Sequence, residues 1–107
     1  MTMREYEILF IMKPNLGEDQ YKKTIESFES WITKTEGEIT LLDPWGLRNL
    51  ASTLNGLDKG YYVLCQFKCG NKTLIEIKKR IAVNEIIFRN LIVKMETIKE
   101  KETKTEE

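Results

Sequence analysis

The sequence has 107 residues, and its seventeen lysines and arginines equal its seventeen aspartates and glutamates, so the formal net charge at pH 7 is zero. A chain of this length suffices for one domain, in which about two-thirds of the unfolded surface can be buried around a single core. The balanced charge excludes a global positive field, so any binding to nucleic acid must come from local patches. No stretch approaches the roughly 20 apolar residues of a membrane span, and we expect a cytoplasmic protein.

The first predicted element is a strand from Glu5 to Lys13, whose even-numbered residues are all apolar and whose odd-numbered residues are mixed. This alternation is typical of a strand with helices covering one of its faces. Pro14 and Asn15 favour a turn that ends the strand.

Apolar residues then recur at spacings of four, three and four, which predicts a helix from about Gly17 to Thr35. Gly37 follows as a stop signal. We expect Trp31, which stands beside the apolar stripe, to cover the edge of the core. The stripe consists of Tyr21, Ile25, Phe28 and Ile32.

Residues 37–43 and 47–54 are predicted to be strands, and the residues between them interrupt regular pairing. Pro44 lacks a donor for the sheet ladder and Gly46 is flexible, so we place a bulge or bend there. This arm also contains Trp45, Arg48 and Leu50. We expect Trp45 and Leu50 to hold the arm in place and Arg48 to project from its edge.

A turn between Asn55 and Gly60 leads into a strand that ends at Cys69, so the two arms form a long hairpin. The odd-numbered residues of this second arm are the more apolar and should face the core. Cys65 and Cys69 would lie about 13 Å apart along it, whereas bridged Cα atoms lie within about 7 Å. We therefore predict two core thiols. Because the sequence has no His, the usual sets of Cys and His ligands cannot be assembled, and no metal or other cofactor is predicted.

A second helix is predicted to begin with Asn71 as its cap, because Thr73 and Glu76 follow at the spacing of a capping box. Its inward stripe is predicted to consist of Leu74, Ile77 and Ile81.

Residues 84–95 form the last predicted strand, which is apolar on both faces. From Glu96 onward, Glu, Lys and Thr alternate without apolar anchors. We therefore expect one domain over residues 1–95 and a charged, disordered tail over residues 96–107.

The order strand, helix, strand, strand, helix, strand predicts an α+β fold. Each strand-helix-strand half should cross over right-handedly, which interleaves the halves into a four-stranded antiparallel sheet with two helices on one face, the ferredoxin-like split βαββαβ motif. This fold carries enzymes, metal carriers, regulatory modules and RNA binders, so the site must decide between them. The sequence has no His, no Gly-rich phosphate loop and no nucleophile beside an evident base, so we expect no catalysis.

The sheet face away from the helices is the expected functional surface. An aromatic on that face can stack on a base and arginines can contact phosphates, which favours RNA binding. An apolar open face is equally typical of a protein docking surface, since a monomer seldom leaves such a face bare. The two interpretations are not exclusive. The residues expected there are Leu9, Ile11, Tyr62, Leu64, Arg89 and Leu91, with Arg4 at one end.

Several short motifs occur in order along residues 3–95. They are Met3-Arg4-Glu5-Tyr6-Glu7, Lys13-Pro14-Asn15-Leu16, the stretch Asp43-Pro44-Trp45-Gly46-Leu47-Arg48-Asn49-Leu50-Ala51, Gly60-Tyr61-Tyr62, and Asn84-Glu85 followed by Phe88-Arg89. Each motif is weak alone, but together and with matching spacings they closely resemble the bacterial small-subunit ribosomal protein S-six (S6) family. One position departs from that pattern, because Ser52 stands where the family usually carries an aromatic residue.

The resemblance implies the split fold and a structural, non-catalytic role in translation. Members of the family bind the central domain of 16S ribosomal RNA together with ribosomal protein S-eighteen (S18), so the resemblance implies these two partners and a place on the ribosome. Three family cations and one aromatic of the open face are thereby expected near RNA or the protein partner, and two open-face leucines complete the set. The set is Arg4, Arg48, Arg89, Tyr62, Leu64 and Leu91.

Two alternative functions of the same fold remain open. An RNA-recognition module outside the ribosome would carry outward-facing aromatics on both central strands, yet the first strand offers Leu9 and Ile11 there and only Tyr62 qualifies. A regulatory module that binds a small ligand between paired sheets usually accompanies another domain, and we expect no second domain in this chain.

Overall fold

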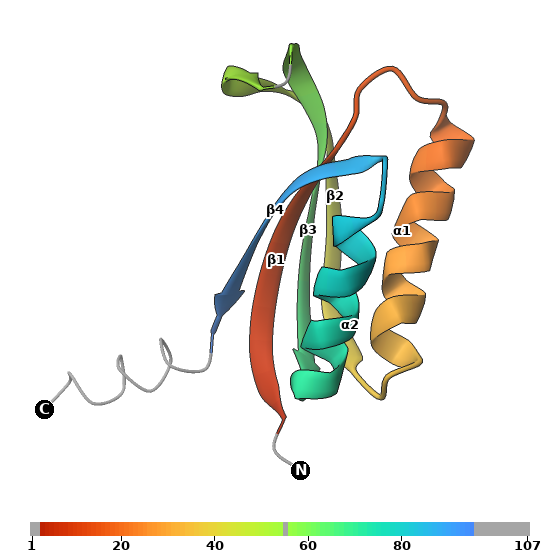
Figure 1. Ribbon diagram of the computed structural model, residues 1–107, viewed down its shortest axis with the longest axis vertical. Coiled ribbons are helices and arrows are strands. Elements are labelled where there is room, and N and C mark those ends of the chain that lie inside the picture. The colour runs from red at the N-terminus through yellow and green to blue at the C-terminus, as the bar shows by residue number, and fades with distance from the viewer. Residues whose placement is uncertain (1–2, 55, 96–107) are drawn as a thin grey trace, which may run out of the picture.

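Four antiparallel strands form one sheet, and two helices cover one of its faces (Figure 1). The computed structural model describes residues 3–54 and 56–95; the predicted tail, residues 96–107, lies outside these ranges. The sheet has the order β2-β3-β1-β4, which confirms the predicted ferredoxin-like arrangement. The elements are β1 (Arg4–Met12), α1 (Glu18–Thr33), β2 (Glu38–Leu54), β3 (Leu57–Cys69), α2 (Asn71–Ala82) and β4 (Ile87–Lys94).

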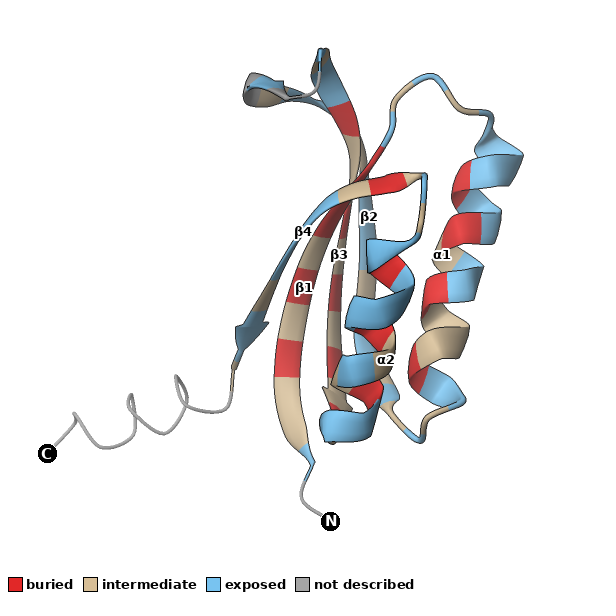
Figure 2. Ribbon diagram, viewed as in Figure 1, coloured by how far each residue is buried: buried red, intermediate tan, exposed pale blue. Residues whose placement is uncertain are grey.

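The core lies between the sheet and the helices (Figure 2). As predicted, the even-numbered side chains of β1 and the odd-numbered side chains of β3 are turned into it. Phe28 of α1 is central, because its ring centroid lies 4.8 Å from that of Phe10 and 6.5 Å from that of Phe67. Rings at such separations pack favourably in tilted or edge-on geometry. The fully buried side chains include Ile8, Phe10, Met12, Phe28, Ile32, Val63, Phe67 and Ile77.

Two cysteines belong to this core, as predicted. Cys65 and Cys69 are both free and buried. Burial raises the pKa of the Cys65 thiol to about 12 and that of the Cys69 thiol to about 11, because a thiolate is poorly solvated in apolar surroundings. Both thiols therefore stay protonated at neutral pH and act as small apolar side chains.

The start of α2 differs from the prediction. The helix begins at Asn71 itself, the capping residue is Gly70, and no side chain caps the helix. Thr73 is buried, and its hydroxyl donates to the carbonyl oxygen of Thr35 at 3.1 Å. The predicted capping box is wrong because this tertiary hydrogen bond occupies the side chain that the box requires.

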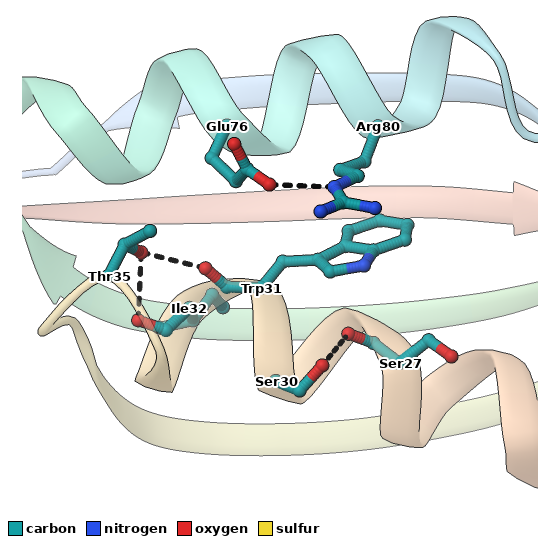
Figure 3. A network of polar contacts seen from close by, with 7 residues as sticks. All are labelled: Ser27, Ser30, Trp31, Ile32, Thr35, Glu76 and Arg80. Carbon is teal, nitrogen blue, oxygen red and sulfur yellow. Dashed lines mark hydrogen bonds and ion pairs between the residues drawn. The ribbon is translucent and has the colours of Figure 1, made fainter.

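A network of polar contacts runs over the two helices (Figure 3). Nε of Arg80 donates to Glu76 at 2.6 Å, and this hydrogen bond lowers the pKa of the Glu76 carboxyl. The partly buried ring of Trp31 on α1 packs against the core as predicted. Past the end of α1, the hydroxyl of Thr35 donates to the carbonyl oxygens of Trp31 and Ile32 at 2.7 and 3.1 Å.

The last strand begins later than predicted. Asn84 belongs to the turn between α2 and β4, where its side-chain oxygen accepts hydrogen bonds from the amides of Ile86 and Ile87 at 2.8 and 2.9 Å. Such a side-chain turn competes with strand pairing. Strand β4 therefore starts at Ile87.

Strand β2 is one long strand whose pairing with β3 shifts in register. One shift falls between Pro44 and Gly46. Gly46 has φ +88°, a left-handed conformation that glycine adopts without a steric penalty. The predicted interruption is thus a β-bulge within a continuous strand and not a break between two strands.

Gly60 of β3 lies against β1, and a Cβ at this position would approach Cγ2 of Ile11 to 2.3 Å. Ile11 is branched at Cβ and only 8% exposed, so its side chain cannot easily turn away.

We expect Gly60→Ala to lower the free energy of unfolding by about 1–3 kcal/mol, measured by urea denaturation. The substitution should cost less in an Ile11→Leu background, which lacks this methyl group. An equal cost in both backgrounds would contradict the steric explanation.

Candidate functional site on the open sheet face

Three leucines from neighbouring strands lie side by side on the sheet face opposite the helices. Leu9 of β1 pairs with Leu64 of β3 on one side and with Leu91 of β4 on the other. Side chains alternate along a strand, and the neighbours Ile8 and Phe10 point into the core, so Leu9 and its partners face away from the helices. Leu91 is 62% exposed. An apolar band therefore crosses the open face of the sheet.

The leucine band belongs to a hollow of about 260 Å³. Val93 extends the band along β4, and Trp45 adds part of β2 to the lining. Apart from one carboxylate, the lining is apolar, and contiguous apolar surface of this kind marks interaction sites on soluble proteins. The lining consists of Glu7, Leu9, Trp45, Leu64, Leu91 and Val93.

Glu7 supplies the one charged group in the lining of this hollow. Its Oε2 accepts a hydrogen bond from Nε2 of Gln66 at 3.1 Å. An ionised carboxylate offers about four acceptor positions, so Glu7 can also accept from a cationic side chain that enters the hollow. The hollow is therefore suited to an apolar segment that carries positive charge.

A cluster of an indole, a phenol, a guanidinium and a carboxylate lies beside the hollow. The Trp45 and Tyr62 rings are stacked, with centroids 6.0 Å apart and planes inclined by 11°. Cζ of Arg48 lies 5.6 Å from the centroid of Trp45, within the range of a cation–π contact. Nε1 of Trp45 donates to Oδ2 of Asp43 at 3.2 Å. The indole thus contacts three polar or aromatic groups at once.

The bulge in β2 brings this cluster onto one face. In a regular strand, residues five positions apart point to opposite faces. Asp43 of β2 pairs with Leu64 of β3, and five residues further on, Arg48 pairs with Gly60, only four residues back along β3. Between these two pairs β2 has one residue more than β3, and this extra residue turns Arg48 to the same face of the sheet as Asp43, the open face.

The structure brings most of the predicted site residues together at one end of the open face. Tyr62 pairs with Ile11, and Ile11 pairs with Arg89, so these three form a row across β3, β1 and β4. Arg48 pairs with Gly60, one residue beyond the last β1–β3 pair, which is Met12 with Tyr61. The β2–β3 hairpin extends past the other strands at this end of the sheet (Figure 1). Leu64 and Leu91 lie in the band described above.

Arg4 lies apart from this cluster. It pairs with Cys69 at the opposite end of β1, seven residues before Ile11, which corresponds to about 23 Å of strand. Its even number places it on the side of β1 that faces the helices, with the buried Tyr6. Arg4 therefore does not share a surface with Arg48.

Two features of the site were not found in the sequence. Trp45 was expected to anchor the arm, but it is 38% exposed and stands on the open face, because the bulge re-aims it. Val93 is absent from the residues expected on the open face, yet it lines the hollow. The period of two that runs through Arg89 and Leu91 along β4 points to it. The bulge itself was predicted, but its effect on side-chain direction depends on the pairing register with β3.

The described residues, 3–54 and 56–95, contain no group of three or more potential metal ligands. Neither helix in this part of the chain is long and apolar enough to cross a membrane.

The model of the family described as Ribosomal protein S6 matches residues 5–94 of the chain. The chain belongs to this S6 family. Similar members are the small ribosomal subunit proteins bS6 of Desulforamulus reducens, 36% identical over 92 residues (86% of this chain, 97% of the relative), and of Helicobacter pylori strain Shi470, 37% identical over 100 residues (94% of this chain, 70% of the relative). The crystal structure of 30S ribosomal protein S6 from Thermotoga maritima covers 99% of this chain and 100% of that chain with a TM-score of 0.86 and 25% identity.

Membership in the S6 family confirms the resemblance found in the sequence. The chain is a protein of the small ribosomal subunit, and its place is the cytoplasmic ribosome of a bacterium. Its surroundings there are ribosomal RNA and other ribosomal proteins.

We expect Trp45 to contribute much less to the free energy of unfolding than the core residue Phe28. Phe28 is fully buried, and Phe28→Ala should lower the free energy of unfolding by about 3–5 kcal/mol. Trp45→Ala removes a partly exposed ring and its stacking on Tyr62, and should cost about 1–2 kcal/mol. Urea denaturation followed by circular dichroism measures both. Equal losses would show that Trp45 belongs to the core.

Proposed function

We propose that this chain is a structural, non-catalytic constituent of the small subunit that docks ribosomal protein S18 on its open sheet face and, with S18, binds the central domain of 16S ribosomal RNA. The proposal is carried by one observation: the open face has an apolar hollow whose lining includes a single carboxylate. S18 is expected to be basic.

An apolar segment with a positive charge fits this hollow. The leucine band offers area whose burial is favourable by about 25 cal/mol per Å². Glu7, already held by Gln66, offers an acceptor for the charge. The two features together favour a basic protein over an uncharged or acidic one.

Binding to RNA is expected to depend on the protein partner. The chain has no net charge, so its own phosphate contacts are few, and the salt-dependent attraction must come largely from a basic neighbour. Arg48 and Arg89 are both exposed near one end of the open face and can add phosphate contacts beside a docked partner. The pair of proteins then presents a composite RNA surface.

The alternative functions receive less support. In the described parts of β1 and β3, Tyr62 is the only aromatic whose register places it on the open face, and its ring is stacked on Trp45. An RNA-recognition module needs two or three such aromatics for stacking on bases. A small-ligand site usually has several polar groups that orient the ligand, whereas the lining of this hollow carries one carboxylate.

Filter binding of a transcript of the 16S central domain tests the proposal. We expect weak binding by the chain alone and an affinity at least about tenfold higher in the presence of saturating S18. Tight, specific binding of the transcript without S18 would refute the dependence on the partner.

Leu91→Asp tests the location of the docking surface. The substitution places a charge in the apolar hollow and should lower the affinity for S18 by about tenfold or more, measured by isothermal titration calorimetry. Ile75→Asp is the matched control, because Ile75 is 65% exposed on α2, on the other side of the sheet. Both melting temperatures should fall by only a few degrees. Equal S18 affinities of the two variants would place the docking surface elsewhere.

A further inference from the structure

Trp45 belongs to two parts of the proposed site at once. Its side chain lines the apolar hollow together with Leu64 and Leu91. The same indole lies within 5.6 Å of the guanidinium carbon of Arg48. A single side chain therefore connects the surface proposed for the protein partner with a cation proposed for RNA.

The orientation of the indole is set by two strands. Tyr62 of β3 stacks on it at 6.0 Å with nearly parallel planes. Asp43, earlier on β2, accepts the indole N–H at 3.2 Å. Because Trp45 is still 38% exposed, these contacts define its direction while leaving part of the ring available to a docked partner.

The indole in turn limits the directions that Arg48 can take. Arg48 is exposed and its side chain is long, so without support it would sample many rotamers. A guanidinium over the face of a tryptophan is held by the cation–π attraction, which is strongest for this ring. Stacking uses the face of the guanidinium, and its N–H donors lie in the plane, where they can still reach phosphate oxygens.

We propose that Trp45 is a positioning residue that couples docking of the protein partner in the hollow to binding of an RNA phosphate by Arg48. This inference rests on the proposed function. A partner seated in the hollow covers Trp45 and restricts its indole, so the Arg48 guanidinium is ordered before RNA arrives and less ordering remains to oppose RNA binding. Because coupling between sites is reciprocal, bound RNA strengthens docking of the partner by the same factor.

The test compares Trp45→Leu with Trp45→Phe. Leucine keeps an apolar wall for the hollow but has no aromatic face, whereas phenylalanine keeps a face on which the guanidinium can lie. Because Trp45 lines the hollow, calorimetry without RNA first measures the S18 affinity of each variant, and that value sets the S18 concentration that saturates it. Filter binding of the 16S central-domain transcript at saturating S18 should show an affinity about threefold to tenfold lower for Trp45→Leu and within about twofold for Trp45→Phe.

A double-mutant cycle with Arg48 separates positioning from a structural role. Arg48→Ala at saturating S18 should weaken RNA binding by about the same factor as Trp45→Leu, and the double variant should lose little more than either single variant. Arg48→Ala and Trp45→Leu should both reduce the slope of log K against log salt concentration, by up to about 0.7–0.9 for one phosphate contact. A role of Trp45 in folding alone would leave this slope unchanged.

Two results overturn the coupling. In one, Trp45→Leu leaves RNA affinity unchanged while Arg48→Ala lowers it; in the other, the two losses are simply additive. Failure of the proposed function has a different signature, because the unchanged chain with S18 would then bind the transcript no better than the chain alone. That result overturns the docking proposal and the coupling together.

Discussion

One extra residue in β2 determines what the open face of the sheet presents. The pairing of β2 with β3 shifts between Pro44 and Gly46, and the positive φ of Gly46 allows the chain to accommodate the shift. Without the bulge, alternation would send Arg48 to the side of the sheet opposite Asp43. With it, the carboxylate of Asp43, the indole of Trp45 and the guanidinium of Arg48 lie on one face and contact each other through the indole. The aromatic and cationic part of the candidate site therefore depends on this bulge, because the bulge changes which face of the sheet the following side chains point to.

The two faces of the sheet differ in what they expose. The helix-covered face contains the core around Phe28, and its two cysteines are buried and protonated, so they act as small apolar side chains. The open face carries a leucine band across three strands and one carboxylate. In the proposed function, a chain with zero net charge contributes to an RNA complex through a docking surface and a few cations, while a basic partner supplies most of the charge.

Alternation of apolar residues predicted the fold and which strand residues lie on the open face. The period of two along β1 and β3 assigned the core-facing side chains, and the same period placed Leu64 and Leu91 on the open face. The capping box failed because Thr73 donates to the carbonyl oxygen of Thr35, 38 residues earlier, a contact that local spacing does not contain. The direction of Trp45 also depends on a register shared with another strand. Local patterns thus predicted the elements, while distant partners decided the details of the site.

The central claim is that the open sheet face, and not the helix layer, receives the protein partner. Amide chemical-shift mapping of the ¹⁵N-labelled chain on addition of S18 tests this claim most directly. We expect the largest shifts in the strand residues around the hollow, at Leu9, Leu64, Leu91 and Val93, with little change at the exposed α2 residues Lys72, Ile75 and Lys79. Shifts concentrated on α2, with the strand signals unchanged, would contradict the account.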